Sequence, residues 1–125
     1  MKIAVYNSMY SLNGKSFLDN IVGHWAVHYQ SNTNRIWKRT NVDRTIITLK
    51  KSNADIIGIC EIIEGQEKEI EEKLRKLGYT HIFFGDGHRT KYNRLRIKVA
   101  IASKLEGIKI KIEGFPTINE LGGVC

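Results

Sequence analysis

The apolar residues of this chain include two short runs that predict buried strands. The first run covers residues 3–6 and stops at Asn7 and Ser8, which favour a turn. The second covers residues 55–61, where most positions between the flanking acids are strongly apolar. Residues 42–51 lie between these runs and predict a helix, because their apolar positions recur at helical spacing. A strand, a helix and a second strand in this order form a βαβ unit, so we expect the two strands to be parallel.

The other elements predict an α/β (α+β) domain over residues 1–125, with one mixed sheet and flanking helices. The stretch 16–29 allows a short helix, and residues 66–77 predict a charged amphipathic helix. Three further strands are predicted, over residues 79–84, 97–102 and 108–112. Gly85-Asp86-Gly87 predicts a turn that ends the first of these three.

Composition and charge indicate which kinds of molecule the chain could bind. The chain has 125 residues, of which 42% are hydrophobic and 26% are charged, as in an ordinary globular domain. Its formal net charge of +7 attracts polyanions such as nucleic acid, phosphorylated small molecules or anionic lipid headgroups, although solubility alone also explains a basic surplus. The sequence shows no signal peptide and no apolar stretch long enough to span a bilayer, so we expect a cytoplasmic protein.

Asn7 and Glu61 are the candidate metal ligands. Each ends one of the two strands predicted to be parallel, so both side chains should emerge at the same edge of the sheet. An amide oxygen and a carboxylate are hard oxygen ligands that suit Mg²⁺ or Mn²⁺. Taken separately, Asn7 is more typical of a turn after a strand, and Glu61 of a surface acid. Their pairing at two strand ends favours a functional role.

The order of these segments resembles the endonuclease/exonuclease/phosphatase superfamily, whose members are DNase I-like. That family opens with a strand ending in Asn, matched here by Ile3-Ala4-Val5-Tyr6-Asn7. A helix follows, and then an apolar strand that starts with Asp and ends with Glu, matched by Asp55-Ile56-Ile57-Gly58-Ile59-Cys60-Glu61. A later Gly-Val-Ala-Ile-type strand is matched by Lys98-Val99-Ala100-Ile101-Ala102-Ser103-Lys104, with Lys98 in place of the glycine.

The resemblance implies a divalent-metal-dependent phosphoesterase. Glu61 is then the direct ligand of Mg²⁺ (or Mn²⁺), with Asn7 beside it, and both are catalytic. The metal would neutralise the phosphoryl oxygens while water attacks in line. The family's later motifs, a His-bearing strand, Asp-x-Asn and Asp-His, are absent from these 125 residues. We therefore expect the N-terminal half of a two-sheet sandwich, without turnover by itself, whose exposed sheet face could favour self-association.

A basic stretch after the third strand is the candidate substrate-binding segment. It contains Arg89, Lys91, Tyr92 and Arg94 in a predicted loop over residues 85–96. Cations interleaved with an aromatic ring suit a phosphate backbone and a stacked base, whereas a mobile charged hairpin is an equal alternative. The substrate stays open among DNA, RNA, inositol phosphate and lipid headgroup, and the positive charge slightly favours nucleic acid.

Two functional hypotheses are consistent with the sequence. One is the phosphoesterase described above. The other is a small basic domain that binds nucleic acid or another anion without catalysis, in which Asn7 and Glu61 are structural. His24 and His28 stand four residues apart and could form a helical metal pair, but no third ligand has suitable spacing, so we expect a solvated or half-buried pair.

Overall fold

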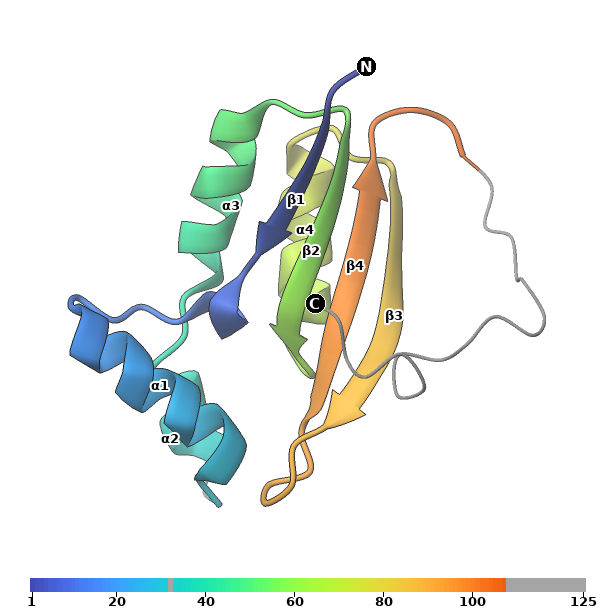
Figure 1. Cartoon of the computed structure of the whole chain (residues 1–125). Helices are drawn as coiled ribbons and strands as arrows, with labels where there is room; N and C mark the ends of the chain where they lie inside the picture. Colours follow the sequence, from blue (N-terminus) through green and yellow to red (C-terminus); the bar gives the residue numbers. More distant parts are fainter. Residues whose placement is uncertain (32, 108–125) are drawn as a thin grey trace.

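The protein folds around one four-stranded mixed sheet with helices packed beside it (Figure 1). The computed structural model describes residues 1–31 and 33–107. The strands are β1 (Ile3–Asn7), β2 (Ile56–Ile63), β3 (His81–Arg89) and β4 (Arg96–Ser103), in the spatial order β1-β2-β4-β3. The helices are α1 (Phe17–Tyr29), α2 (Thr33–Trp37), α3 (Val42–Ser52) and α4 (Glu67–Lys76), with a short turn η1 (Met9–Ser11) after β1.

The predicted parallel pairing of the first two strands is confirmed. β1 and β2 run in the same direction, and their register aligns Ile3 with Ile56 and Asn7 with Cys60. Strand β4 then pairs antiparallel with both β2 and β3, which makes the sheet mixed. The carboxyl ends of β1 and β2 therefore lie together at one edge of the sheet.

Local side-chain chemistry explains where α3 begins and ends. The Asn41 side chain accepts a hydrogen bond of 2.9 Å from the backbone N–H of Asp43, which satisfies a free donor at the start of the helix. Asn53 closes the helix in the left-handed conformation with φ of 46°, which Asn tolerates better than most residues. None of the helices in the described ranges is both long and apolar enough to cross a bilayer.

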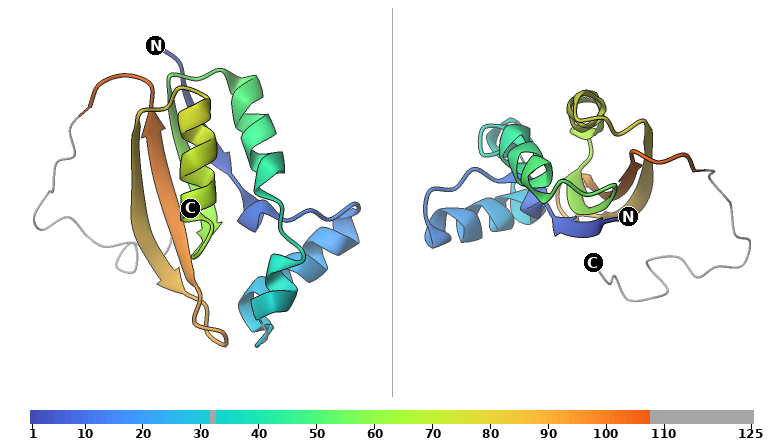
Figure 2. Two further views of the ribbon diagram at one scale, coloured as in Figure 1. Left: turned by 180° about the vertical axis from the view of Figure 1, so that it is seen from behind. Right: turned by 90° about the horizontal axis from the view of Figure 1, so that it is seen from above.

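Helices α3 and α4 cover one face of the sheet, whereas no described helix covers the other (Figure 2). The covered face holds the main core, in which Ile57, Ile59 and Ile62 from β2 pack with Leu49 from α3 and Leu74 from α4. The opposite face exposes large apolar side chains, from Ile3, Val5, Phe83 and Ile101. An exposed sheet face was expected from the sequence, and the described residues have one.

The predicted turn at Gly85-Asp86-Gly87 is wrong, because β3 continues through these residues. Gly85 and Asp86 pair with Val99 and Lys98 of β4, and the hairpin turns later, between Arg89 and Arg96. Gly87 has a different purpose: a Cβ at this position would lie 2.3 Å from the carbonyl oxygen of Ile97. The glycine therefore permits close approach of two backbones inside the strand. The strand predicted over residues 108–112 lies outside the described residues.

The buried Gln66 side chain ties the end of β2 to the turn after β1. Its Oε1 accepts a hydrogen bond of 3.2 Å from the N–H of Ile63, and its Nε2 donates one of 3.1 Å to the carbonyl oxygen of Tyr10. Gln66 is 4% exposed, so water does not readily replace either bond.

We predict that Gln66→Ala lowers the free energy of unfolding by about 2–4 kcal/mol, because it leaves two buried backbone groups without partners. Chemical denaturation followed by circular dichroism measures the change. Glu72→Ala on the exposed face of α4 is the matched control and should change the free energy by less than about 0.5 kcal/mol. Equal effects of the two substitutions would contradict the linking role of Gln66.

Candidate functional site

Asn7 ends β1, and Glu61 lies two residues before the end of the neighbouring parallel strand β2. The register pairs Asn7 with Cys60, so Glu61 follows the partner of Asn7 by one residue. Asn7 is exposed, and its Oδ1 accepts a hydrogen bond of 2.8 Å from the N–H of Met9. A carbonyl oxygen has two lone pairs, so this bond fixes the amide and leaves one lone pair available.

A β-bulge changes the direction of Glu61. Ile59 pairs with Ala100 and Ile62 pairs with Lys98, so β2 has one residue more than β4 in this interval. In a regular strand Glu61 would share the buried face of Ile59, but the extra residue gives that place to Ile62. Glu61 is half-buried and has a φ of 58°, in the left-handed region. This backbone costs about 1–2 kcal/mol for a residue other than glycine, and such strain often marks functional positions.

The turn after β1 is also left-handed. Met9, Tyr10 and Ser11 have φ values of 46°, 60° and 55°. Ser8, which is buried, holds the start of this turn against β2: its N–H donates to the carbonyl oxygen of Cys60 at 3.0 Å. The Ser8 hydroxyl also lies 2.9 Å from that oxygen and 2.8 Å from the carbonyl oxygen of Glu61.

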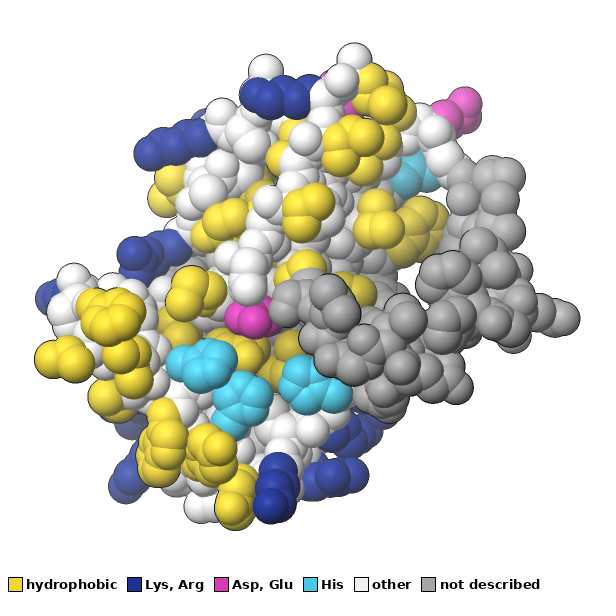
Figure 3. Space-filling view, in the orientation of Figure 1, with side chains coloured by type: hydrophobic (Ala, Val, Ile, Leu, Met, Phe, Trp, Pro, Cys, Tyr) yellow, Lys and Arg dark blue, Asp and Glu magenta, His cyan; other side chains and the backbone are white. Residues whose placement is uncertain are grey.

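A group of histidines lies beside this strand edge, and we call His24, His28 and His88 the histidine group. The ring of His28 lies 5.0 Å from that of His24 and 6.4 Å from that of His88, and its Nε2 is 3.0 Å from the Tyr10 hydroxyl. Figure 3 shows histidine side chains gathered next to acidic atoms on the sheet face that lacks helices. The negative charge of Glu61 acts on both Tyr10 and His28 and raises the pKa of each.

The surroundings favour the neutral forms of Tyr10 and His28. Burial raises the pKa of Tyr10, and the negative charge of Glu61 raises it further. Burial lowers the pKa of His28, and repulsion from His24 and His88 adds to the effect, while Glu61 opposes it. A neutral imidazole beside a carboxylate can accept a proton, which is the chemistry expected of a general base.

The site offers few protein ligands for a metal ion. Within residues 1–31 and 33–107, no group of three or more His, Cys, Asp or Glu side chains is arranged to hold a metal. Mg²⁺ typically uses only one or two protein carboxylates and completes its shell with water and substrate phosphate. Asn7 and Glu61 are the residues of this edge that fit such a shell.

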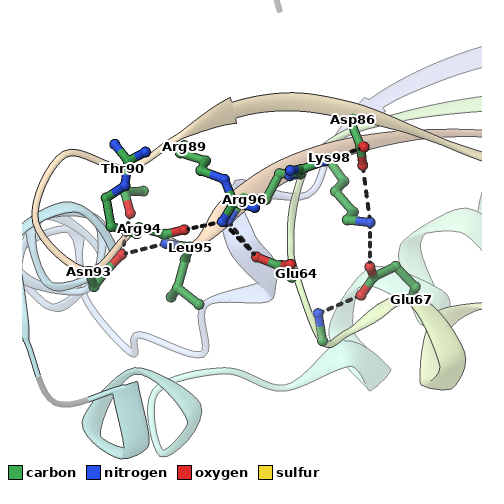
Figure 4. Close-up of polar contacts among 11 residues, drawn as sticks. Glu64, Glu67, Asp86, Arg89, Thr90, Asn93, Arg94, Leu95, Arg96 and Lys98 are labelled. Carbon is green, nitrogen blue, oxygen red and sulfur yellow. Dashed lines mark hydrogen bonds and ion pairs between the residues drawn. The ribbon is translucent and has the colours of Figure 1, made fainter.

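The candidate substrate-binding residues occupy the β3–β4 hairpin (Figure 4). The hairpin is docked to α1, because the Asn93 side chain donates hydrogen bonds of 2.6 Å and 3.0 Å to the carbonyl oxygens of Val27 and Gln30. Tyr92 is exposed, its ring lies 5.1 Å from that of Tyr29, and Lys91 Nζ lies 5.7 Å from the Tyr92 ring centroid. These contacts join the hairpin to α1.

Part of the positive charge of this hairpin is paired. Arg89 lies 3.8 Å from Glu64, and Arg96 forms an ion pair with Asp86. Lys98 pairs with Glu67 at 2.8 Å and with Asp86 at 3.2 Å. Three acids therefore pair with these cations: Asp86 of β3, and Glu64 and Glu67, which follow β2. Among the described residues, Lys91 and Arg94 form no ion pair.

Sequence reasoning missed two features of this site. Tyr10 follows a turn signal and has no periodic pattern around it, so nothing in the sequence predicts its burial beside His28. The i, i+4 spacing of His24 and His28 predicted a solvated or half-buried pair, and the structure confirms that His24 is exposed and His28 half-buried. The contact with His88 was not predicted, because it depends on the packing of α1 against the β3–β4 hairpin.

We predict that the pKa of His28 lies below its usual value of 6.5 and moves in opposite directions in two variants. His88→Gln should raise this pKa because it removes a repulsive charge, and Glu61→Gln should lower it because it removes an attractive one. Titration of the histidine ring protons by nuclear magnetic resonance measures both shifts. Glu72→Gln, on the helix-covered side of the sheet, is the control and should leave His28 unchanged. A His28 pKa that is unchanged in both His88→Gln and Glu61→Gln would contradict this arrangement of charges.

Comparison with protein-family models, with curated proteins and with solved structures gives no match in any of the three. The residues themselves define the candidate site: Asn7 at the end of β1, Glu61 in the bulge of β2, the left-handed turn η1 and the histidine group beside them. The chain is a mixed α/β protein with one four-stranded sheet and four helices within its described residues.

Proposed function

We propose that this chain is the N-terminal half of a DNase I-like domain of the endonuclease/exonuclease/phosphatase type, and that it contributes the metal ligands of a phosphoesterase. One observation carries the proposal: Asn7 ends β1, Glu61 lies in the bulge of the adjacent parallel strand β2, and its left-handed backbone turns it away from the core. A strained backbone costs free energy and is found more often at functional residues than at ordinary surface carboxylates.

The proposal gives each residue a distinct role. Glu61 supplies the anionic oxygen that holds Mg²⁺ or Mn²⁺, and Asn7 supplies a neutral oxygen fixed by its bond to Met9. When bound, the ion neutralises phosphoryl oxygens and stabilises the leaving oxygen. His28 is favoured as a neutral imidazole, and in the tautomer whose Nε2–H donates to the Tyr10 hydroxyl its free Nδ1 would accept a proton from water. The proposed substrate carries a phosphodiester or phosphomonoester, and turnover belongs to a polypeptide that also contains the second half of the sandwich.

Binding of Mn²⁺ by the 125-residue chain tests the metal site without requiring turnover. Paramagnetic broadening of backbone resonances should be strongest at Asn7 and Glu61 and should disappear on addition of Mg²⁺ or EDTA. We predict that Glu61→Gln weakens Mn²⁺ binding by about tenfold or more, because the charged ligand becomes neutral. The amide keeps the shape of the side chain, so the fold should be preserved.

Glu72→Gln removes an equal charge from α4 and serves as the matched control for this metal titration. Its Mn²⁺ affinity should equal that of the wild type. Broadening centred on other acidic residues, or equal affinities for the Glu61 and Glu72 variants, would refute the assignment of the metal to this strand edge.

A second candidate function is binding of nucleic acid without catalysis. The observation in its favour is a pair of exposed aromatic rings, Tyr92 and Tyr29, that lie next to each other. The nearby cations Lys91 and Arg94 form no ion pair among the described residues. Exposed aromatic rings stack on bases, and the adjacent cations attract phosphates.

Fluorescence anisotropy with a single-stranded oligonucleotide separates the two candidates. If the hairpin binds nucleic acid, Lys91→Gln and Arg94→Gln should each reduce the salt dependence of binding by about one ion, whereas Lys50→Gln at the end of α3 should not. Binding that persists in EDTA and in Glu61→Gln would favour the non-catalytic domain. Magnesium-dependent binding that Glu61→Gln abolishes would favour the phosphoesterase.

A further inference from the structure

Helix α1 exposes its large side chains to solvent. At 100° per residue, six apolar residues fall on an arc of about 140° of the helix, which also contains the half-buried His28. These residues form what we call the α1 ridge, and their exposed fractions are Phe17 78%, Leu18 70%, Ile21 48%, Val22 46%, Trp25 56% and Tyr29 49%. The arc contains no Asp, Glu, Lys or Arg.

The small residues of α1, in contrast, face the protein. The buried positions of the helix are Gly23, Ala26 and Val27. A Cβ at Gly23 would lie 2.9 Å from Leu12 Cδ2, so the helix approaches the turn after β1 closely through a residue without a side chain. A helix that serves only the core normally buries its bulky residues and exposes polar ones. The arrangement of α1 is reversed, and exposed apolar patches of this kind mark binding surfaces.

Positive charge borders the α1 ridge on more than one side. Val22 and Trp25 line a shallow pocket together with Arg35, Lys38 and Arg39. At the carboxyl end of the helix, Tyr29 contacts Tyr92 of the hairpin that carries Lys91 and Arg94. Figure 3 shows apolar side chains gathered over α1 with Lys and Arg around them.

Negative charge is nearly absent from this surface. Asp19 is the one acidic residue of α1, and its carboxylate accepts hydrogen bonds from the N–H groups of Lys15 and Ser16. That carboxylate is therefore engaged in capping the helix. An anionic surface that approaches the ridge meets cations at its borders and no free acid along the helix.

We propose that the α1 ridge docks the protein onto an anionic membrane surface, with α1 lying in the plane of the lipid headgroups. Aliphatic side chains enter the acyl boundary, Trp and Tyr prefer the headgroup region, and Lys and Arg attract anionic lipids. Nucleic acid accounts for the cations and rings, but it offers no partner for Leu18, Ile21 and Val22. A convex apolar helix with a cationic border matches the chemistry of an anionic bilayer. This inference goes beyond the phosphoesterase proposal and does not depend on it.

Vesicle sedimentation with the 125-residue chain tests this docking. The protein should bind vesicles of phosphatidylcholine mixed with phosphatidylserine more tightly than vesicles of phosphatidylcholine alone, and added salt should weaken the binding. The variant with both Phe17→Ser and Trp25→Ser should bind at least about tenfold more weakly, because two exposed apolar anchors are lost. Ile47→Ser is the matched control: Ile47 is 55% exposed on α3, and its loss should leave binding unchanged.

Three outcomes would overturn the proposal. These are an absence of binding to phosphatidylserine vesicles, undiminished binding by the double variant, and equal loss in Ile47→Ser. If the wild type does not bind vesicles but forms a dimer, and the double variant is monomeric, the α1 ridge would instead bind a second copy of the chain. Glu61→Gln should bind vesicles like the wild type, so failure of the metal site and failure of the membrane surface can be told apart.

Discussion

The in-register pairing of β1 with β2 is the constraint on which the rest of the structure depends. It brings Asn7 opposite Cys60 and places Glu61 one residue farther along the neighbouring strand. Ser8 prolongs the pairing past the end of β1 by bonding to the carbonyl oxygens of Cys60 and Glu61. A shift of one residue would move Asn7 to the helix-covered face, because side chains alternate along a strand. The register therefore specifies both the core and the candidate site.

Backbone strain accumulates at this same edge of the sheet. Glu61 and the three residues of η1 all have positive φ, which costs about 1–2 kcal/mol for each non-glycine residue. Buried hydrogen bonds offset that cost: Gln66 binds the Tyr10 carbonyl, and the Ser11 hydroxyl lies 2.9 Å from the Thr45 hydroxyl. Both bonds come from elements of the helix-covered side, α3 and the start of α4. The core thus holds the strained segment beside Asn7 and Glu61 in place.

Sequence reasoning predicted the elements whose signals are local. The helix over residues 42–51 and the parallel pairing of the strands on either side of it were predicted correctly, because each depends on neighbouring residues or on a short crossover. The bulge at Glu61 was not predicted, since an apolar run does not show where a partner strand has one residue fewer. Gly87 was taken as part of a turn because glycine permits both turns and close backbone contacts, and only the pairing with β4 decides between them. The position of Asn7 at the end of a strand was predicted correctly, but the predicted strand end at Glu61 is wrong, because β2 continues to Ile63 after the bulge. Tyr10 and His88 joined this region through tertiary packing.

Helix α1 contributes to two surfaces through different side chains. His24 and His28 face the strand edge, while the bulky apolar residues of the ridge face solvent. The helix packs against the protein through its buried residues Gly23, Ala26 and Val27. The Tyr29 ring lies 6.4 Å from that of His28, but within the described residues Phe17 and Trp25 make no ring contact with the histidine group. The proposed metal site at Glu61 and the proposed membrane surface can therefore be tested by separate substitutions, at Glu61 for the first and at Phe17 and Trp25 for the second.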